Sequence, residues 1–192
     1  MDYLNTDHTF ILQETDKMRL EIKKHDLSID LLSSAEIYYQ ENLCDLINNP
    51  LILIGSKYIL IEFHPLIIPK SYEQVFYNLQ VEGITPIIAH PERYVKVQKD
   101  IDIARKWVDK GYILQINCAS LLGSFGKKIE KTAFDLFNNG LCHIVGSDAH
   151  NDARRNFCMK DCLEFINDRF GTSNKDIIIQ KKNVSYIQNN IY

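Results

Sequence analysis

The sequence contains no long hydrophobic run, no block of like charges and no low-complexity tract. Its longest apolar stretches, such as 58–61 and 86–89, are far shorter than the ~20 residues of a transmembrane helix, so no membrane insertion is predicted. The first residues show no basic region followed by an apolar core, so no signal peptide is predicted either. The net charge is −3, from 22 Lys+Arg and 25 Asp+Glu, which argues against nucleic-acid binding driven by bulk positive charge.

Several signatures of phosphate and hydrolase chemistry are missing as well. The sequence has neither a Walker loop nor a Gly-x-Gly-x-x-Gly segment, the Gly-rich loops that cradle phosphates. It has no Gly-x-Ser-x-Gly elbow, in which a serine hydrolase presents its nucleophile. No cysteine is followed by arginine six positions later, so the phosphate loop of cysteine-dependent tyrosine phosphatases is excluded.

The composition is that of one globular domain. The chain has 192 residues, of which 45% are hydrophobic and 24% charged, and a chain of this length buries roughly 70% of its unfolded surface. We therefore predict a single domain over residues 1–192. The five cysteines are an odd number without a secretory signal, which predicts reduced thiols and a cytoplasmic location. Cys158 and Cys162 lie one helical turn apart and are interpreted as small apolar helix residues.

Short apolar runs alternate with amphipathic stretches along the chain, and this alternation predicts an α/β fold with a parallel sheet or barrel. Continuous apolar strands fit a sheet that is covered on both faces. Strands are predicted within 27–39, where positions 27, 29 and 31 alternate, and at 58–62, 85–90, 112–117 and 141–147. Helices are predicted at 10–24, 41–47, 71–81, 101–110, 127–139 and 156–170. Two shorter elements, of no assigned type, are predicted at 177–179 and 184–191. Ser71 is the expected N-cap of its helix.

Three predicted strands end in a residue that can titrate or bind a metal. Glu62 ends one strand, His90 ends the next, and Asp148 with His150 follows a third. The carboxyl ends of parallel strands meet at one face, which carries the active site in such folds. Each residue alone has an ordinary explanation, such as a loop acid, a hydrogen-bonded histidine or a helix cap. Their shared position indicates a metal site with nitrogen and oxygen ligands, for which Mn²⁺, Fe²⁺ and Zn²⁺ are candidates.

Arginines stand close to these strand ends in the sequence. Arg93 follows His90 by three residues, and Arg154 and Arg155 follow His150 by four and five. Because a guanidinium group binds phosphate bidentately, metal-ligand residues and arginines on one face together predict the hydrolysis of a phosphoester.

Four stretches carry a resemblance to a known family. They are Ile-Glu-Phe at 61–63, Pro-Ile-Ile-Ala-His-Pro-Glu-Arg-Tyr at 86–94, Leu-Gln-Ile-Asn at 114–117 with Ser-Leu-Leu-Gly-Ser-Phe-Gly at 120–126, and Val-Gly-Ser-Asp-Ala-His-Asn at 145–151. In these stretches the chain resembles the bacterial manganese-dependent protein-tyrosine phosphatases of the PHP (polymerase and histidinol phosphatase) type, which belong to capsule and exopolysaccharide operons. The resemblance implies a distorted (β/α)7-type PHP barrel that holds a cluster of metal ions.

The resemblance also implies roles for individual residues. The implied metal ligands are Glu36, Glu62, His90, Asp148 and His150, and Glu36 is expected after a strand as a bridging ligand. Arg93 and Arg155 resemble the phosphate-binding arginines, and Arg155 is preferred to Arg154 by its spacing from His150. The implied cofactor is Mn²⁺, with Fe²⁺ or Zn²⁺ as alternatives, and the implied partner is a phosphotyrosine protein such as a bacterial tyrosine kinase.

One departure from the family pattern affects these expectations. The family begins with a strand ending in His-x-His, an Asp-Asp-Gly segment and a strand ending in Thr-Pro-His, and none of these motifs occurs here. The expectation is therefore a PHP-like domain that lacks its first one to two βα units, with a barrel incomplete at the N-terminus and weak or absent catalysis. The alternatives are a histidinol-phosphate type of small-molecule phosphatase and an inactive remnant that serves as a binding module.

Overall fold

A computed structural model describes residues 8–49 and 51–170 of the chain. Its centre is a five-stranded parallel sheet in the order β1-β2-β3-β4-β5. The strands are β1 Glu36–Tyr38, β2 Tyr58–Glu62, β3 Thr85–Ala89, β4 Ile113–Asn117 and β5 Ile144–Gly146. The α/β fold with a parallel sheet is thereby confirmed, and each strand from β2 to β5 pairs with the strand that precedes it in the sequence. The segments predicted at 177–179 and 184–191 lie outside the described residues.

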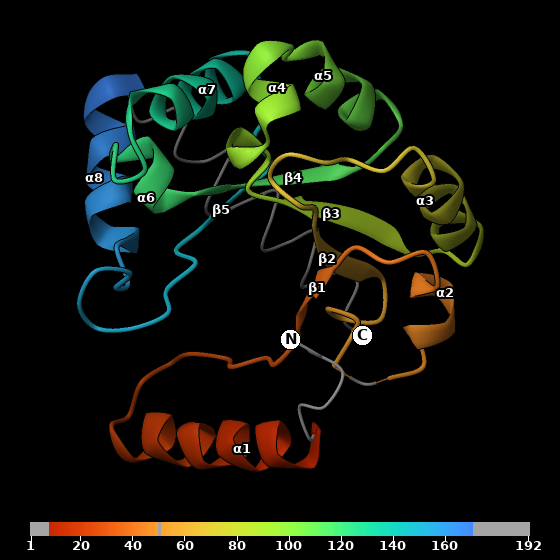
Figure 1. Cartoon of the computed structure of the whole chain (residues 1–192). Coiled ribbons are helices and arrows are strands. Elements are labelled where there is room, and N and C mark those ends of the chain that lie inside the picture. Colours follow the sequence, from red (N-terminus) through yellow and green to blue (C-terminus); the bar gives the residue numbers. More distant parts are fainter. Residues whose placement is uncertain (1–7, 50, 171–192) are drawn as a thin grey trace.

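Helices connect the strands and cover the sheet. They are α1 His8–Lys24, α2 Leu43–Leu46, α3 Tyr72–Val81, α4 Val95–Lys99, α5 Asp102–Asp109, α6 Cys118–Leu121, α7 Lys127–Asn138 and α8 Met159–Phe170, with a short 3-10 helix η2 Pro91–Arg93. Figure 1 shows α3, α4, α5 and α7 arched over one side of the sheet, while α1 lies apart on the other side. None of the helices in the described part of the chain is long and apolar enough to cross a membrane.

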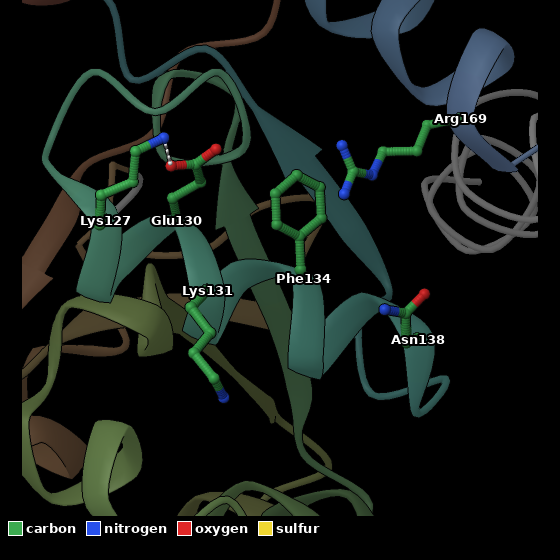
Figure 2. A pocket seen from close by; sticks show the side chains of 6 residues that line it. All are labelled: Lys127, Glu130, Lys131, Phe134, Asn138 and Arg169. Atoms are coloured by element: carbon green, nitrogen blue, oxygen red, sulfur yellow. Dashed lines mark hydrogen bonds and ion pairs between the residues drawn. The ribbon is translucent and has the colours of Figure 1, made fainter.

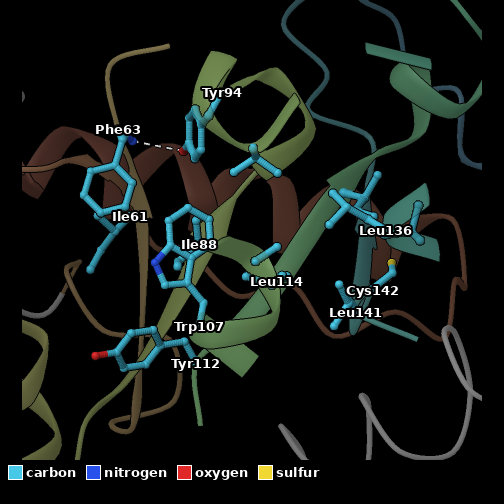
Figure 3. Packing of buried hydrophobic residues seen from close by; sticks show 14 of the residues in the cluster. Ile61, Phe63, Ile88, Tyr94, Trp107, Tyr112, Leu114, Leu136, Leu141 and Cys142 are labelled. Carbon is cyan, nitrogen blue, oxygen red and sulfur yellow. Dashed lines mark hydrogen bonds between the residues drawn. The ribbon is translucent and has the colours of Figure 1, made fainter. Parts of the chain in front are cut away.

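The core lies between the sheet and the covering helices and is centred on one aromatic cluster. Phe63, directly after β2, is fully buried, and its ring packs against those of Tyr94 and Trp107 at centroid distances of 5.8 and 6.2 Å. Figure 3 shows these rings beside the aliphatic side chains of β2, β3 and β4. Aromatic pairs at this separation contribute beyond their buried area, so the cluster fixes the ends of β2 and β3, where polar side chains follow.

The first strand lies within the range predicted for it, 27–39, but not at the alternating residues. The alternating residues at 27–31 form no strand; instead β1 spans Glu36–Tyr38, and Leu27 and Ile29 are exposed. An alternating pattern forms a stable strand only when a neighbouring strand accepts its backbone hydrogen bonds, and β2 pairs with residues 36–38. Glu36 therefore begins a strand, which corrects the expectation that it follows one.

Local helix signals were partly right. The helices predicted at 10–24, 41–47, 71–81, 101–110, 127–139 and 156–170 are all present, with boundaries shifted by up to three residues. Ser71 does precede α3, but its side chain caps no backbone N–H; the hydroxyl instead accepts a hydrogen bond from the Tyr39 phenol at 3.0 Å. Neither α4 nor α6 was predicted, since five and four residues are too few for a periodic pattern to show.

Candidate metal and phosphate site

Glu36, the first residue of β1, converges with Glu62, the last residue of β2, and with His90, which directly follows β3. His90 Nε2 lies 3.1 Å from Glu36 Oε1 and 3.4 Å from Glu62 Oε1, and the possible ligand atoms of the three residues lie within 4.8 Å of one another. The imidazole is buried, whereas about a third of each carboxylate side chain is exposed. The three residues are called the triad below. Its imidazole is buried in the protein, and its two carboxylates are partly open to solvent.

Tyr94 holds the backbone at two positions of the triad. Its buried hydroxyl donates to the carbonyl oxygen of Ala89 at 2.7 Å and accepts from the N–H of Phe63 at 3.0 Å. Ala89 immediately precedes His90, and Phe63 immediately follows Glu62. One phenol therefore fixes the spacing of two strand ends, and burial raises its pKa well above the usual range, which keeps it a donor. His90 itself has a left-handed backbone with φ +32°, a strained conformation for a residue other than glycine.

A second group of polar residues surrounds Asp148, after β5. The carboxylate oxygen Oδ2 accepts hydrogen bonds from Asn117 Nδ2 at 2.7 Å and Arg155 Nη2 at 2.5 Å, and Arg93 Nη1 lies 3.6 Å away. The side chain is only 10% exposed, so these charges interact with little screening by water. Asp148 and its arginines, with Asn117, form what is called the Asp148 cluster below.

The loop after Asp148 is folded so that Arg155 turns back onto it. The N–H groups of His150 and Asn151 both donate to the Arg155 carbonyl, at 2.8 and 3.2 Å, and Asn151 Oδ1 accepts from the Arg155 N–H at 3.1 Å. Arg154, by contrast, is exposed. His150 is about half exposed, and its Nδ1 lies 2.9 Å from the Asp148 carbonyl oxygen.

Glu92 is a fully buried carboxylic acid beneath the site. Its Oε1 accepts from the Ser120 hydroxyl at 2.6 Å and from the Asn117 backbone N–H at 3.1 Å. Burial is the main cause that raises the pKa of Glu92. Through these bonds, η2 after β3 is joined to the end of β4, and the Asn117 side chain is held where it meets Asp148.

Arg93 links the triad to the Asp148 cluster. It follows His90 in η2, its guanidinium faces Asp148, and it also lies over the Phe125 ring at 5.5 Å from the ring centroid. Stacking on an aromatic face restrains an arginine while its N–H groups stay free to bind. Arg93 is 26% exposed, so part of its fork reaches solvent at the same face.

All seven residues selected from the sequence are thus placed at one edge of the sheet, but in two sets. Glu36, Glu62 and His90 share one group of ligand atoms, whereas Asp148 and His150 lie with the arginines in the other. Sequence reasoning missed Tyr94, Glu92 and Asn117 as functional residues. Asn117 gave the signal used for the others, a polar residue at the end of an apolar strand; the contacts of Tyr94 and Glu92 had no local signal.

The triad fits a divalent cation. Two carboxylates meet at one imidazole nitrogen, and like charges at this separation repel unless a proton or a cation lies between them. Carboxylate oxygen and imidazole nitrogen are ligands suited to Mn²⁺, Fe²⁺ or Zn²⁺. The Asp148 cluster adds two guanidinium groups that match the oxygens of a phosphoryl group. A metal-competent group and an anion-binding group therefore lie on one face.

Comparisons with known proteins identify the family of the chain. A family model described as "Capsular polysaccharide synthesis, CpsB/CapC" matches residues 3–188. Tyrosine-protein phosphatase YwqE of Bacillus subtilis (strain 168) is 33% identical over 183 residues, covering 91% of this chain and 72% of YwqE. Tyrosine-protein phosphatase CpsB of Streptococcus pneumoniae is 34% identical over 147 residues, covering 71% of this chain and 59% of CpsB.

A solved structure shares the fold. It comes from work on YwqE and pneumococcal CpsB, described as unique metal-dependent tyrosine phosphatases, and matches with a TM-score of 0.76 at 35% sequence identity. The match covers 85% of this chain and 67% of the solved chain.

Proposed function

This chain belongs to the CpsB/CapC family of capsular polysaccharide synthesis, and we propose that it is a metal-dependent phosphatase that hydrolyses protein phosphotyrosine. The observation that carries the proposal is the placement of the triad and the Asp148 cluster on one edge of the sheet, joined by Arg93. The named phosphatase activity of the relatives supports it. The chain spans 59% of CpsB and 72% of YwqE, so activity, substrate and partner all belong to the proposal.

Each residue of the site has a proposed part in the reaction. Glu36, Glu62, His90, Asp148 and His150 would hold the metal, and when bound it would lower the pKa of a water molecule and neutralise charge on phosphoryl oxygens. Arg93 and Arg155 would bind the non-bridging oxygens and stabilise the charge of the transition state. The tyrosine phenolate has a conjugate-acid pKa of about 10, so it leaves without strong acid assistance. Mn²⁺ is the proposed ion because the chain resembles manganese-dependent phosphatases, and its carboxylate and imidazole ligands suit Fe²⁺ and Zn²⁺ as well.

Further parts of the proposal concern the fold and the cellular setting. The sequential order of the five parallel strands supports a distorted PHP-type barrel of about seven strands within a single domain. The resemblance to phosphatases of capsule operons suggests a bacterial tyrosine kinase as the phosphotyrosine protein. The five free cysteines support a reducing compartment, the cytoplasm.

The proposal separates metal binding from phosphate binding, and paired variants test that separation. Asp148→Ala should lower both bound manganese and turnover of a phosphotyrosine peptide. Arg155→Ala should retain the metal while turnover falls by roughly 10²–10³-fold, the usual effect of removing one transition-state donor. Arg154→Ala is the matched control. Arg154 is the exposed neighbour of Arg155, and its replacement should change neither bound manganese nor turnover by more than about 2-fold. Full metal and full activity in Asp148→Ala would contradict the assignment.

A further inference from the structure

A pocket of about 200 Å³ opens at the carboxyl ends of β1 and β2. It is lined by Tyr38, Tyr39, Phe63, His64, Ile67 and Pro69. These side chains are aromatic or aliphatic except for the imidazole of His64. Pockets that bind small ligands are largely apolar with a few polar groups nearby, and this one has its polar groups in the adjacent triad.

The pocket and the triad are built on the same two strand ends. Tyr38 follows Glu36 by two residues, so the two side chains lie on the same face of β1. In the β1–β2 pairing, Tyr38 stands opposite Glu62, and the Tyr39 N–H donates to the Glu62 carbonyl at 2.8 Å. A molecule bound at the triad therefore has this pocket as its immediate apolar neighbour.

The wall opposite β1 is a short ordered turn. The Ile67 N–H donates to the His64 carbonyl at 3.1 Å, and the Leu66 N–H donates to His64 Nδ1 at 3.2 Å. Behind this turn, Phe63 is fixed by Tyr94 through its backbone N–H. The pocket is thus formed by hydrogen bonds within the chain before any ligand binds, which lowers the entropic cost of binding.

The rim of the pocket exposes large apolar surface. Tyr38 is 45% exposed and Ile67 is 58% exposed, although large apolar side chains gain by leaving water. Exposed apolar surface that borders a concave site is typical of ligand binding. The rim therefore has apolar area available for a ligand that reaches the triad.

We propose that Tyr38 and Ile67 hold the aromatic ring of the substrate in this pocket and set the preference for an aryl phosphomonoester; the inference rests on the proposed function. The phosphoryl group lies at the triad and the Asp148 cluster while the phenyl ring of phosphotyrosine packs between Tyr38 and Ile67. A cavity of roughly 150 Å³ in another protein holds benzene, so the volume suffices for one ring. The short side chain of phosphoserine leaves this apolar surface in contact with water.

Two non-hydrolysable probes separate the ring from the phosphoryl group. Benzylphosphonate carries both groups, whereas methylphosphonate carries the phosphoryl mimic alone. Calorimetric titration of the 192-residue chain with Mn²⁺ should show benzylphosphonate binding about 10-fold more tightly, the gain expected from burying part of one ring. Ile67→Ser should remove most of this advantage and leave the affinity for methylphosphonate within about 2-fold.

Leu66→Ser is the matched control for this experiment. Leu66 is the neighbouring residue, is 62% exposed, and does not line the pocket, so the two affinities should stay at their wild-type values. Because Ile67 is itself exposed, its replacement leaves the core unchanged.

The other outcomes identify which part of the reasoning fails. Equal affinity of wild type and Ile67→Ser for benzylphosphonate overturns the ring pocket, as does an equal loss for both probes. If the wild-type chain with Mn²⁺ binds neither phosphonate, the proposed phosphatase site itself is wrong.

Discussion

The Tyr94 hydroxyl offers a sharp test of how the fold supports the site. Tyr94→Phe removes one oxygen atom and keeps the ring that packs against Phe63 and Trp107. The buried N–H of Phe63 then loses its partner, and an unsatisfied buried polar group costs about 1–3 kcal/mol. We therefore expect the free energy of unfolding to fall by that amount.

The assay is urea unfolding followed by the fluorescence of Trp107, the single tryptophan of the chain. For a urea slope of roughly 2 kcal/mol/M, the midpoint should fall by roughly 0.5–1.5 M. The same change frees the strand ends that carry Glu62 and His90, so the affinity for Mn²⁺ should drop by roughly 10-fold, as for other outer-shell partners of metal ligands.

Tyr77→Phe is the control, since Tyr77 is 61% exposed on α3 and its hydroxyl lies at the surface. Its midpoint and metal affinity should match those of the wild type. A Tyr94→Phe protein that also matches the wild type in both would refute the view that this phenol holds the two strand ends together.

Two other predictions follow from buried polar contacts. Asn117→Ala removes the donor to Asp148 and should weaken Mn²⁺ binding by roughly 10–100-fold in titrations. The control Asn139→Ala, at the exposed end of α7, should leave Mn²⁺ binding unchanged. Equal affinities of the two variants for Mn²⁺ would contradict the role of Asn117. Burial lowers the pKa of His143 from 6.5, so the unfolded chain binds more protons than the folded chain below pH 6.5. The stability contributed by the neutral imidazole is therefore complete above pH 6.5 and is lost as the pH falls toward the folded-state pKa. Because Nδ1 accepts from the Leu114 N–H, His143→Gln should flatten this loss in urea midpoints measured between pH 7 and 5; an unchanged pH profile would contradict it.

The basic pocket between α7 and α8 in Figure 2 shows why a hollow alone does not indicate a site. Lys127 is paired with Glu130 at 2.9 Å and Lys131 with Asp135 at 2.6 Å, and the guanidinium of Arg169 lies over Phe134 at 4.5 Å. The cations that line it are thus already engaged within the chain. The aromatic pocket beside the triad differs, because the neighbouring side chains are two carboxylates and an imidazole that could hold one metal ion.

Sequence reasoning worked where one strand carries its own signal. The runs that became β2, β3 and β4 are apolar and long enough to be recognised, and Glu62 and His90 stand at the ends of two of them. The first strand was predicted within 27–39, but its position there was not, because β1 has three residues and is defined by its pairing with β2. The apolar alternation at 27–31 was the stronger local pattern but has no such partner among the described strands.

The supporting contacts of the site were beyond sequence reasoning for a related reason. Tyr94 reaches back 31 residues to Phe63, and Asn117 reaches forward 31 residues to Asp148. Contacts of this range depend on how neighbouring strands are aligned, and no local periodicity encodes that alignment. The same holds for the pocket, whose walls at Tyr38 and Ile67 come together only when β1 and β2 pair.

The most direct test of the central claim is hydrolysis of a phosphotyrosine peptide by the 192-residue chain as a function of Mn²⁺ concentration. The account predicts saturable activation by Mn²⁺ in the wild type and its loss in His90→Ala, in protein shown by circular dichroism to be folded. Turnover that is independent of the metal, or equal in wild type and variant, would contradict the claim that the strand-end triad holds the catalytic metal.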